Sequence, residues 1–177
     1  MQKTAYGVFD DHSDVGPVKT KGEVNYDANR QEYTLTGSGT NMWLGSDEFH
    51  VVWKRVKGNF ILSSRAQFVG KELSLTERLA GLSARVLSQT PRTRPLSSMV
   101  MVERRCSFVA QVERSQRKRS SRSRDADILQ LERKGDTYVA SMAKFGDPFV
   151  SEQIAGLDLG DEVYVGLLCM FPQQGRG

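Results

Sequence analysis

The sequence predicts an all-β fold, an antiparallel sandwich or barrel of short strands. Residues 22–37, GEVNYDANRQEYTLTG, contain two strand patterns around a polar turn at 28–31. Residues 127–133 and 137–144 form the clearest hairpin pattern, because Gly135 supplies the positive φ that a tight turn needs. DEVYVGLLC, near the C-terminus, is rich in β-branched residues and predicts a last strand.

A second pair of strands is predicted between residues 47 and 68, with a turn at VKGN. Apolar residues alternate along both halves, and FGDPF at 145–149 predicts another turn because proline cannot pair in a ladder. Together these patterns predict that residues 23–68 and 127–168 form one sandwich. We expect its buried set to include Phe49, Val51, Trp53, Phe60, Leu62, Leu131 and Val165.

The middle of the chain has a different pattern. The spacing of Leu75, Leu79, Leu82 and Val86 predicts a short helix over 74–88. Ser74 and Glu77 would form its capping box. Residues 91–124 show neither a helical stripe nor a strand pair, so we expect 110–124 to be exposed and irregular.

Charge divides the chain in the same way. Residues 71–124 hold 13 Lys or Arg and 4 acidic residues, against 25 and 21 in all 177 residues. This Arg/Ser-rich segment is atypical within the single domain expected over 1–177, and it reads as an insert or a linker. Its basic run at 104–124 makes nucleic-acid binding one candidate function. No apolar run approaches a membrane span, and the first residues contain no signal core, so the chain as written is expected in the cytoplasm.

Five blocks of the sequence, GVFDDHSDVGPV, YTLTGSGTNMW, DEFHVVWK, DILQLERKGDTYVASMAKFGDPF and LGDEVYVGL, resemble a bacterial family with a concanavalin A-like fold. Its members often accompany TolB-like β-propeller proteins of biopolymer transport. The resemblance covers 6–70 and 125–167. It implies a jelly-roll of two packed sheets, a saccharide or cell-envelope polymer as ligand, and a TolB-like β-propeller protein as partner. It also implies that relatives are found in the cell envelope or are secreted.

Family members carry a motif of the form HGDG where this chain has residues 71–124. The tetrapeptide MVMV at 99–102 must be encoded ATG GTN ATG GTN. Read from the third base of the preceding codon, this run gives x-Gly-x-Gly, as the family motif requires. A shift after Leu167 likewise permits the family ending FVCSHN. We therefore expect residues 71–124 and 168–177 to be out-of-frame translation of a family member, with a selected or disordered basic insert as the alternative.

The candidate ligand-binding residues are Trp43, His12, Asp14, Asp47 and His50. The acidic stretch DDHSD reads as a turn-forming loop, and carboxylates there could hold calcium, although the spacing matches no calcium motif. Trp43 follows a glycine-rich stretch and is the better aromatic for stacking on a sugar, because Trp53 lies in an alternating core pattern.

The same residues predict no catalytic group, metal or cofactor. Two histidines cannot make a zinc site without carboxylates, and the two cysteines have no metal-ligand spacing. A retaining glycosidase needs two carboxylates about 5–5.5 Å apart, whereas Asp47 and Glu48 point to opposite faces of a strand. The leading expectation is a non-catalytic binding module, with a sandwich glycoside hydrolase as the alternative.

Overall fold

The computed structural model of the chain describes residues 5–39, 48–67, 82–87, 98–103, 107–112, 115–120, 126–155 and 158–169. All regular structure in these residues is β, and every pair of neighbouring strands is antiparallel. The predicted all-β antiparallel class is therefore confirmed. The described part of the chain includes no helix long and apolar enough to cross a membrane.

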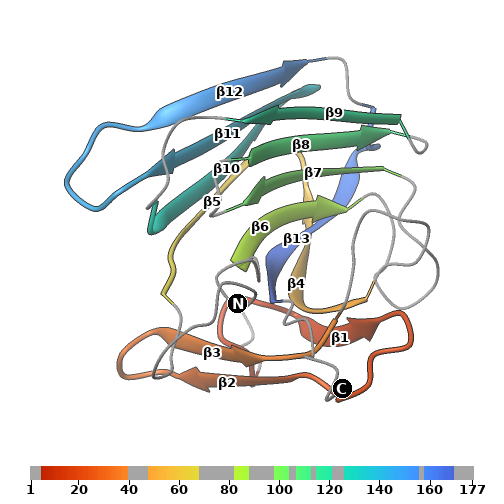
Figure 1. The fold of residues 1–177 in the computed structure, drawn as a ribbon, viewed down its shortest axis with the longest axis vertical. Coiled ribbons are helices and arrows are strands. Elements are labelled where there is room, and N and C mark those ends of the chain that lie inside the picture. The colour runs from red at the N-terminus through yellow and green to blue at the C-terminus, as the bar shows by residue number, and fades with distance from the viewer. Residues whose placement is uncertain are drawn as a thin grey trace, which may run out of the picture.

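The strands form two large sheets and one small one (Figure 1). The seven-stranded sheet has the order β1-β4-β13-β6-β7-β8-β9, and the four-stranded sheet has the order β12-β11-β10-β5. The bounds of the first sheet, in that order, are Asp11–Val15, Phe49–Lys57, Glu162–Cys169, Leu82–Leu87, Ser98–Glu103, Ser107–Val112 and Ser115–Ser120. Those of the second are Val150–Ala155, Thr137–Ala143, Ile128–Lys134 and Phe60–Arg65.

The small sheet is the predicted N-terminal hairpin, β2 (Glu23–Asp27) with β3 (Glu32–Thr36). Its turn ends at Gln31, which has a positive φ of 54°. The pairs Val24–Leu35 and Tyr26–Tyr33 share one face of the hairpin. Of these side chains, Val24, Tyr33 and Leu35 pack against the hydrophobic core, so the hairpin covers one end of it.

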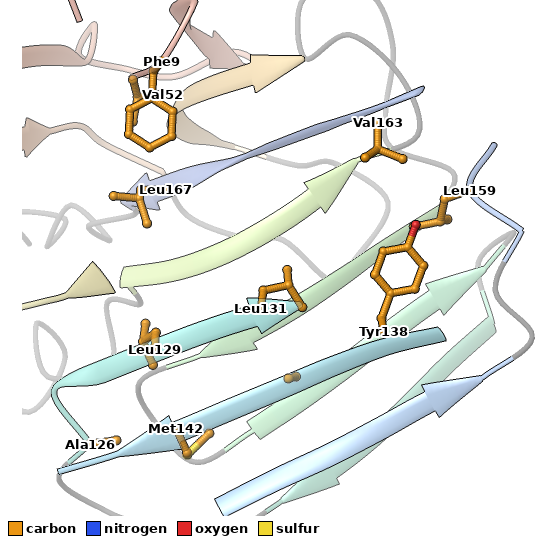
Figure 2. Close-up of a cluster of buried hydrophobic side chains, with 11 residues drawn as sticks. Phe9, Val52, Ala126, Leu129, Leu131, Tyr138, Met142, Leu159, Val163 and Leu167 are labelled. Carbon is orange, nitrogen blue, oxygen red and sulfur yellow. The ribbon is translucent and has the colours of Figure 1, made fainter. Parts of the chain in front are cut away.

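The hydrophobic core lies where the four-stranded sheet faces the seven-stranded sheet (Figure 2). Alternate residues of β10 and β11 are buried because one face of each strand is turned inward. Inward side chains of β4 and β13 complete the cluster. Its members are Phe9, Val52, Ala126, Leu129, Leu131, Tyr138, Ala140, Met142, Leu159, Val163 and Leu167.

The predicted buried set is confirmed for four of its seven residues: Phe49, Val51, Leu131 and Val165 are buried. Trp53, Phe60 and Leu62 are only half-buried. The alternation at the start of β4 predicts one buried face, that of Phe49 and Val51. His50 and Val52, on the opposite face, are buried as well. This part of β4 is therefore covered on both sides.

One of two predicted glycine turns is confirmed as a hairpin and the other is not. The 127–144 hairpin is confirmed as β10–β11, with Gly135 at a φ of 59°. The turn at VKGN, however, joins β4 in one large sheet to β5 in the other, and so is no hairpin. Sequence patterns cannot distinguish a hairpin turn from a connection between two sheets, because a glycine with positive φ suits both. Gly58 has such a φ, of 71°.

The expected helix over 74–88 is wrong for residues 82–87, which form β6 between β13 and β7; the rest of that range lies outside the described residues. LSARVL also alternates with a period of two, and pairing on both sides overrides the helical spacing. The irregular structure expected at 110–124 is wrong for 110–112 and 115–120, which belong to β8 and β9.

The DDHSD stretch is expected to be a loop, but from Asp11 onward its residues belong to the edge strand β1.

Candidate functional site

The outer edge of the seven-stranded sheet brings three of the predicted ligand-binding residues together. In the register of β1 and β4, Asp14 lies directly opposite His50, and His12 lies opposite Val52. Directly paired residues in an antiparallel ladder present their side chains on the same face. His12, Asp14 and His50 therefore share the inner face of this sheet, the face that also carries Val52.

Four side chains on this face form one continuous series of hydrogen bonds, which we call the Tyr6–Asp14 relay. The Tyr6 hydroxyl lies 3.1 Å from His12 Nε2, and His12 Nδ1 lies 3.1 Å from His50 Nε2. His50 Nδ1 lies 2.8 Å from Asp14 Oδ1. The same carboxylate oxygen accepts the backbone N–H of Gly22 at 3.0 Å, so the relay ends on a backbone group.

The carboxylate at one end sets the direction of every hydrogen bond in the relay. An ionised carboxylate only accepts, so His50 donates its Nδ1–H to Asp14 and leaves Nε2 as an acceptor. His12 must then donate Nδ1–H to His50, which leaves the His12 Nε2 lone pair to accept the Tyr6 O–H. In this arrangement both imidazoles carry a proton on Nδ1, and every polar atom between Tyr6 and Asp14 is paired.

Burial along the relay is greatest at His50. Tyr6 and His12 are half-buried, the Asp14 side chain keeps 24% exposure, and His50 keeps 1%. Burial is the main reason that the pKa of His50 is lowered, since a charged imidazole would lose its hydration there. The hydrogen bond and charge of Asp14 act in the opposite direction and only partly offset this effect. The relay thus runs from a half-buried end to a buried neutral imidazole.

Two glycines allow backbone to approach His50. A Cβ atom added at Gly22 would overlap the His50 ring, and one added at Gly37 would lie 2.7 Å from His50 Cβ. Such separations are too short for ordinary contacts, so only glycine fits at either position without a shift. Gly22 and Gly37 directly precede β2 and follow β3, and they hold that hairpin against β4.

Cys169 is the neighbour of His50 on β13. It is buried, and this burial, with a smaller effect of the Asp14 charge, raises the pKa of its thiol to about 12. A thiol with so high a pKa stays protonated and unreactive at neutral pH. Cys169 therefore acts here as a small packing residue beside the relay.

The remaining predicted residues, Trp43 and Asp47, lie outside the described residues. Gly39 and Glu48 are in direct contact, since a Cβ at Gly39 would overlap the Glu48 carbonyl, and Glu48 leads directly into Phe49 and His50.

The other acids of DDHSD have separate partners. Asp10 accepts the Arg55 backbone N–H at 2.9 Å and pairs with Lys54 at 3.4 Å, while Asp11 accepts the N–H of His12 at 2.7 Å. The carboxylates of Asp10, Asp11 and Asp14, which the sequence suggested as ligands of one cation, therefore bind different groups. Within the described residues, no cluster of three or more His, Cys, Asp or Glu side chains could hold a metal ion.

Two members of the site were not predicted. Tyr6 precedes the first strand and belongs to no alternating pattern. Gly22 had no role in the sequence beyond bounding a strand, although a glycine directly before a strand is a signal for close backbone approach.

Comparison with known proteins adds no assignment to this geometry. No family model, no curated protein and no solved structure matches this chain.

Proposed function

We propose that this chain is a non-catalytic β-sandwich module, of the concanavalin A-like jelly-roll type, that binds a saccharide or another cell-envelope polymer. One observation carries the proposal. His12 and Asp14 of the DDHSD stretch and His50 of a distant stretch, all candidate ligand-binding residues in the sequence, belong to one hydrogen-bonded relay. The other two candidates, Trp43 and Asp47, lie outside the described residues.

The relay has the properties of a preorganised polar site. Its inner members hold one another in fixed rotamers, so few side chains would need to be ordered on binding. The half-buried Tyr6 and His12 form the outer end, with ring centroids 4.8 Å apart in an edge-on arrangement. A sugar hydroxyl can exchange hydrogen bonds with the Tyr6 hydroxyl, and Trp43 would offer an aromatic face for the sugar ring.

A binding role fits the relay better than glycoside hydrolysis. Hydrolysis uses two carboxyl groups on either side of the scissile bond. The relay contains one carboxylate, Asp14, and its Oδ1 already accepts two hydrogen bonds. The chemistry available at the outer end is the exchange of hydrogen bonds by a phenol and an imidazole.

Isothermal titration of the purified chain with soluble polysaccharides tests the proposal. We expect Tyr6→Phe to weaken binding by about 2–10-fold, the value of one hydrogen bond, and Trp43→Ala to do the same through lost stacking. Tyr164→Phe is the matched control, because Tyr164 alternates with inward Val163 and Val165 and so lies on the outer face. Equal affinities for Tyr6→Phe, Trp43→Ala and the control would rule out this site.

The proposed partner is a TolB-like β-propeller protein, on the strength of the sequence resemblance alone. Co-elution of the two purified proteins in size-exclusion chromatography tests it. Separate elution at micromolar concentrations would speak against the partnership.

A further inference from the structure

Exposed apolar side chains are concentrated at the connection between β11 and β12. Of the large hydrophobic residues that the described part of the chain exposes, three lie within six positions: Phe145 at 64%, Phe149 at 47% and Val150 at 44%. The other two, Val8 and Ile61, lie on other elements. A group of exposed aromatic rings in one turn needs an explanation that single exposed residues do not.

This turn is held rigidly by Asp127. Asp127 Oδ1 accepts the backbone N–H of Phe145 at 2.6 Å, and Oδ2 pairs with Arg65 Nε at 3.2 Å. Burial alone would raise the pKa of Asp127, but these hydrogen bonds outweigh it and lower the pKa, so the carboxylate stays ionised. A further hydrogen bond, from Asp147 N–H to the Lys144 carbonyl at 2.9 Å, closes the turn.

Arg65 adds a directed cation to the aromatic surface. Its guanidinium carbon lies 4.3 Å from the centre of the Phe145 ring. Asp127 accepts a hydrogen bond from Nε of the Arg65 guanidinium. The two terminal nitrogens of that guanidinium have no hydrogen-bond partner among the described residues. The Arg65 side chain is 63% exposed while that of Asp127 is 20% exposed, so the guanidinium is the more accessible charge of the pair.

We propose that Arg65, Phe145 and Phe149 form a binding site for an acidic saccharide chain, one that carries carboxylates on its sugar rings. The terminal nitrogens of Arg65 would pair with the sugar carboxylate, since guanidinium matches a carboxylate in a two-point geometry. The apolar face of the sugar ring would stack on Phe149 and on the open part of Phe145. The site lies at the Phe145 turn, away from the relay strands β1 and β4, and rests on the proposed function only for its saccharide class.

The size of the surface favours a sugar over a protein partner. A stable protein interface buries about 800 Å² on each side, which takes roughly 20–30 residues. The Phe145 turn offers three apolar side chains, followed by the exposed polar residues Ser151 and Gln153 along β12. One or two sugar rings need no larger apolar surface than this.

The test is titration of the purified full chain with polygalacturonate, an acidic polysaccharide, and with dextran, a neutral one. We expect polygalacturonate to bind more tightly than dextran, and its affinity to fall with added salt. Phe149→Ala should weaken polygalacturonate binding by about 3–10-fold, the value of a lost aromatic contact. Arg65→Lys should weaken polygalacturonate binding by about 10-fold, because lysine keeps the positive charge but cannot make the two-point contact of a guanidinium with a carboxylate. Ile61→Ser, which also removes an exposed apolar side chain, is the control and should bind like the unmodified chain.

Each outcome separates this inference from the proposed function. If polygalacturonate binds and neither Phe149→Ala nor Arg65→Lys weakens it, the Phe145 site is wrong while the saccharide function stands. If dextran binds as tightly as polygalacturonate, the acidic class is wrong. If neither binds, the Phe145 site is wrong, and the proposed function is judged by its own titration with Tyr6→Phe and Trp43→Ala. Sedimentation of the same variants completes the test, because a dimer that Phe149→Ala dissociates would make this turn a protein interface instead.

Discussion

The Tyr6–Asp14 relay depends on which nitrogen of each imidazole carries a proton. His50 can accept from His12 only while its Nε2 is unprotonated, and its 1% exposure offers little water to a charged ring. A proton added to His50 would put two N–H groups face to face at 3.1 Å. One buried proton thus decides whether His12 and His50 stay hydrogen-bonded to each other.

The stability of the fold should therefore fall as the solution becomes mildly acidic. The pKa of His50 is lowered from its ordinary value of 6.5 in the folded chain, mainly by burial. Below pH 6.5 the unfolded chain binds a proton that the folded chain excludes, so the free energy of unfolding decreases with falling pH. The slope reaches at most about 1.4 kcal/mol per pH unit and ends at the lowered pKa of the folded state.

Urea unfolding across this pH window measures the effect, with His50→Gln as the variant that cannot titrate. We expect the variant to be less stable at neutral pH but to have a flatter pH dependence. The same slope in both proteins would show that His50 does not control the acid sensitivity.

At the residue scale, the sequence predicted the chemistry of the site in part. The sequence offers His12 and Asp14 in one stretch and His50 in another as ligand candidates, and the structure joins the two stretches. Their mutual distances could not be predicted because they depend on the register of β1 with β4, two strands more than 30 residues apart in the chain. Tyr6 was missed for the same reason, since only the pairing of those strands brings His12 to it.

At the element scale, the strands with a clear alternation were predicted and those defined by their neighbours were not. β10 and β11 form a local hairpin with a glycine turn, so short-range signals suffice. β6 lies between β13 and β7, and its partner β13 is far away in the sequence. β9 carries SQRKRS, a sequence without apolar alternation, which an outer strand tolerates because charged residues protect an open edge.

The docking of the β2–β3 hairpin onto β4 gives a second prediction. Gly22→Ala places a methyl group against the His50 ring, and we expect it to cost about 1–3 kcal/mol of stability through overpacking. In the Gly22→Ala/His50→Ala double variant the methyl group gains room, so the two costs should not add. A double-mutant cycle from urea denaturation should give a coupling of about 0.5–3 kcal/mol. Additive effects would mean that Gly22 does not hold the hairpin against His50.

At the scale of the whole molecule, two parts of the chain differ in composition but share one sheet. β6, β7, β8 and β9 come from the basic segment 71–124, and they extend the sheet beyond β1, β4 and β13. A family member would need strands at this place, as the resemblance implies. Charged residues are ordinary on an edge strand such as β9, so the hypothesis that residues 71–124 are out-of-frame translation stays a prediction.

The coding sequence tests that hypothesis. We predict that the frame offset across residues 71–124 is free of stop codons and encodes G-x-G, followed within a few residues by L-Q. Sequencing of the gene is the measurement. A stop codon in that offset frame, or the absence of the L-Q pair, would favour a selected basic insert.

The central claim, that the Tyr6–Asp14 relay exists and binds a saccharide at its outer end, can be tested in one NMR experiment. The chain has two histidines, so a long-range ¹H–¹⁵N spectrum of the imidazoles contains two sets of signals, which His12→Gln assigns. At neutral pH we predict that both rings are Nδ1–H tautomers and that a bound polysaccharide shifts the His12 Nε2 signal most strongly. An Nε2–H tautomer at either ring, or a His12 signal that does not move under saturating polysaccharide, would contradict the account.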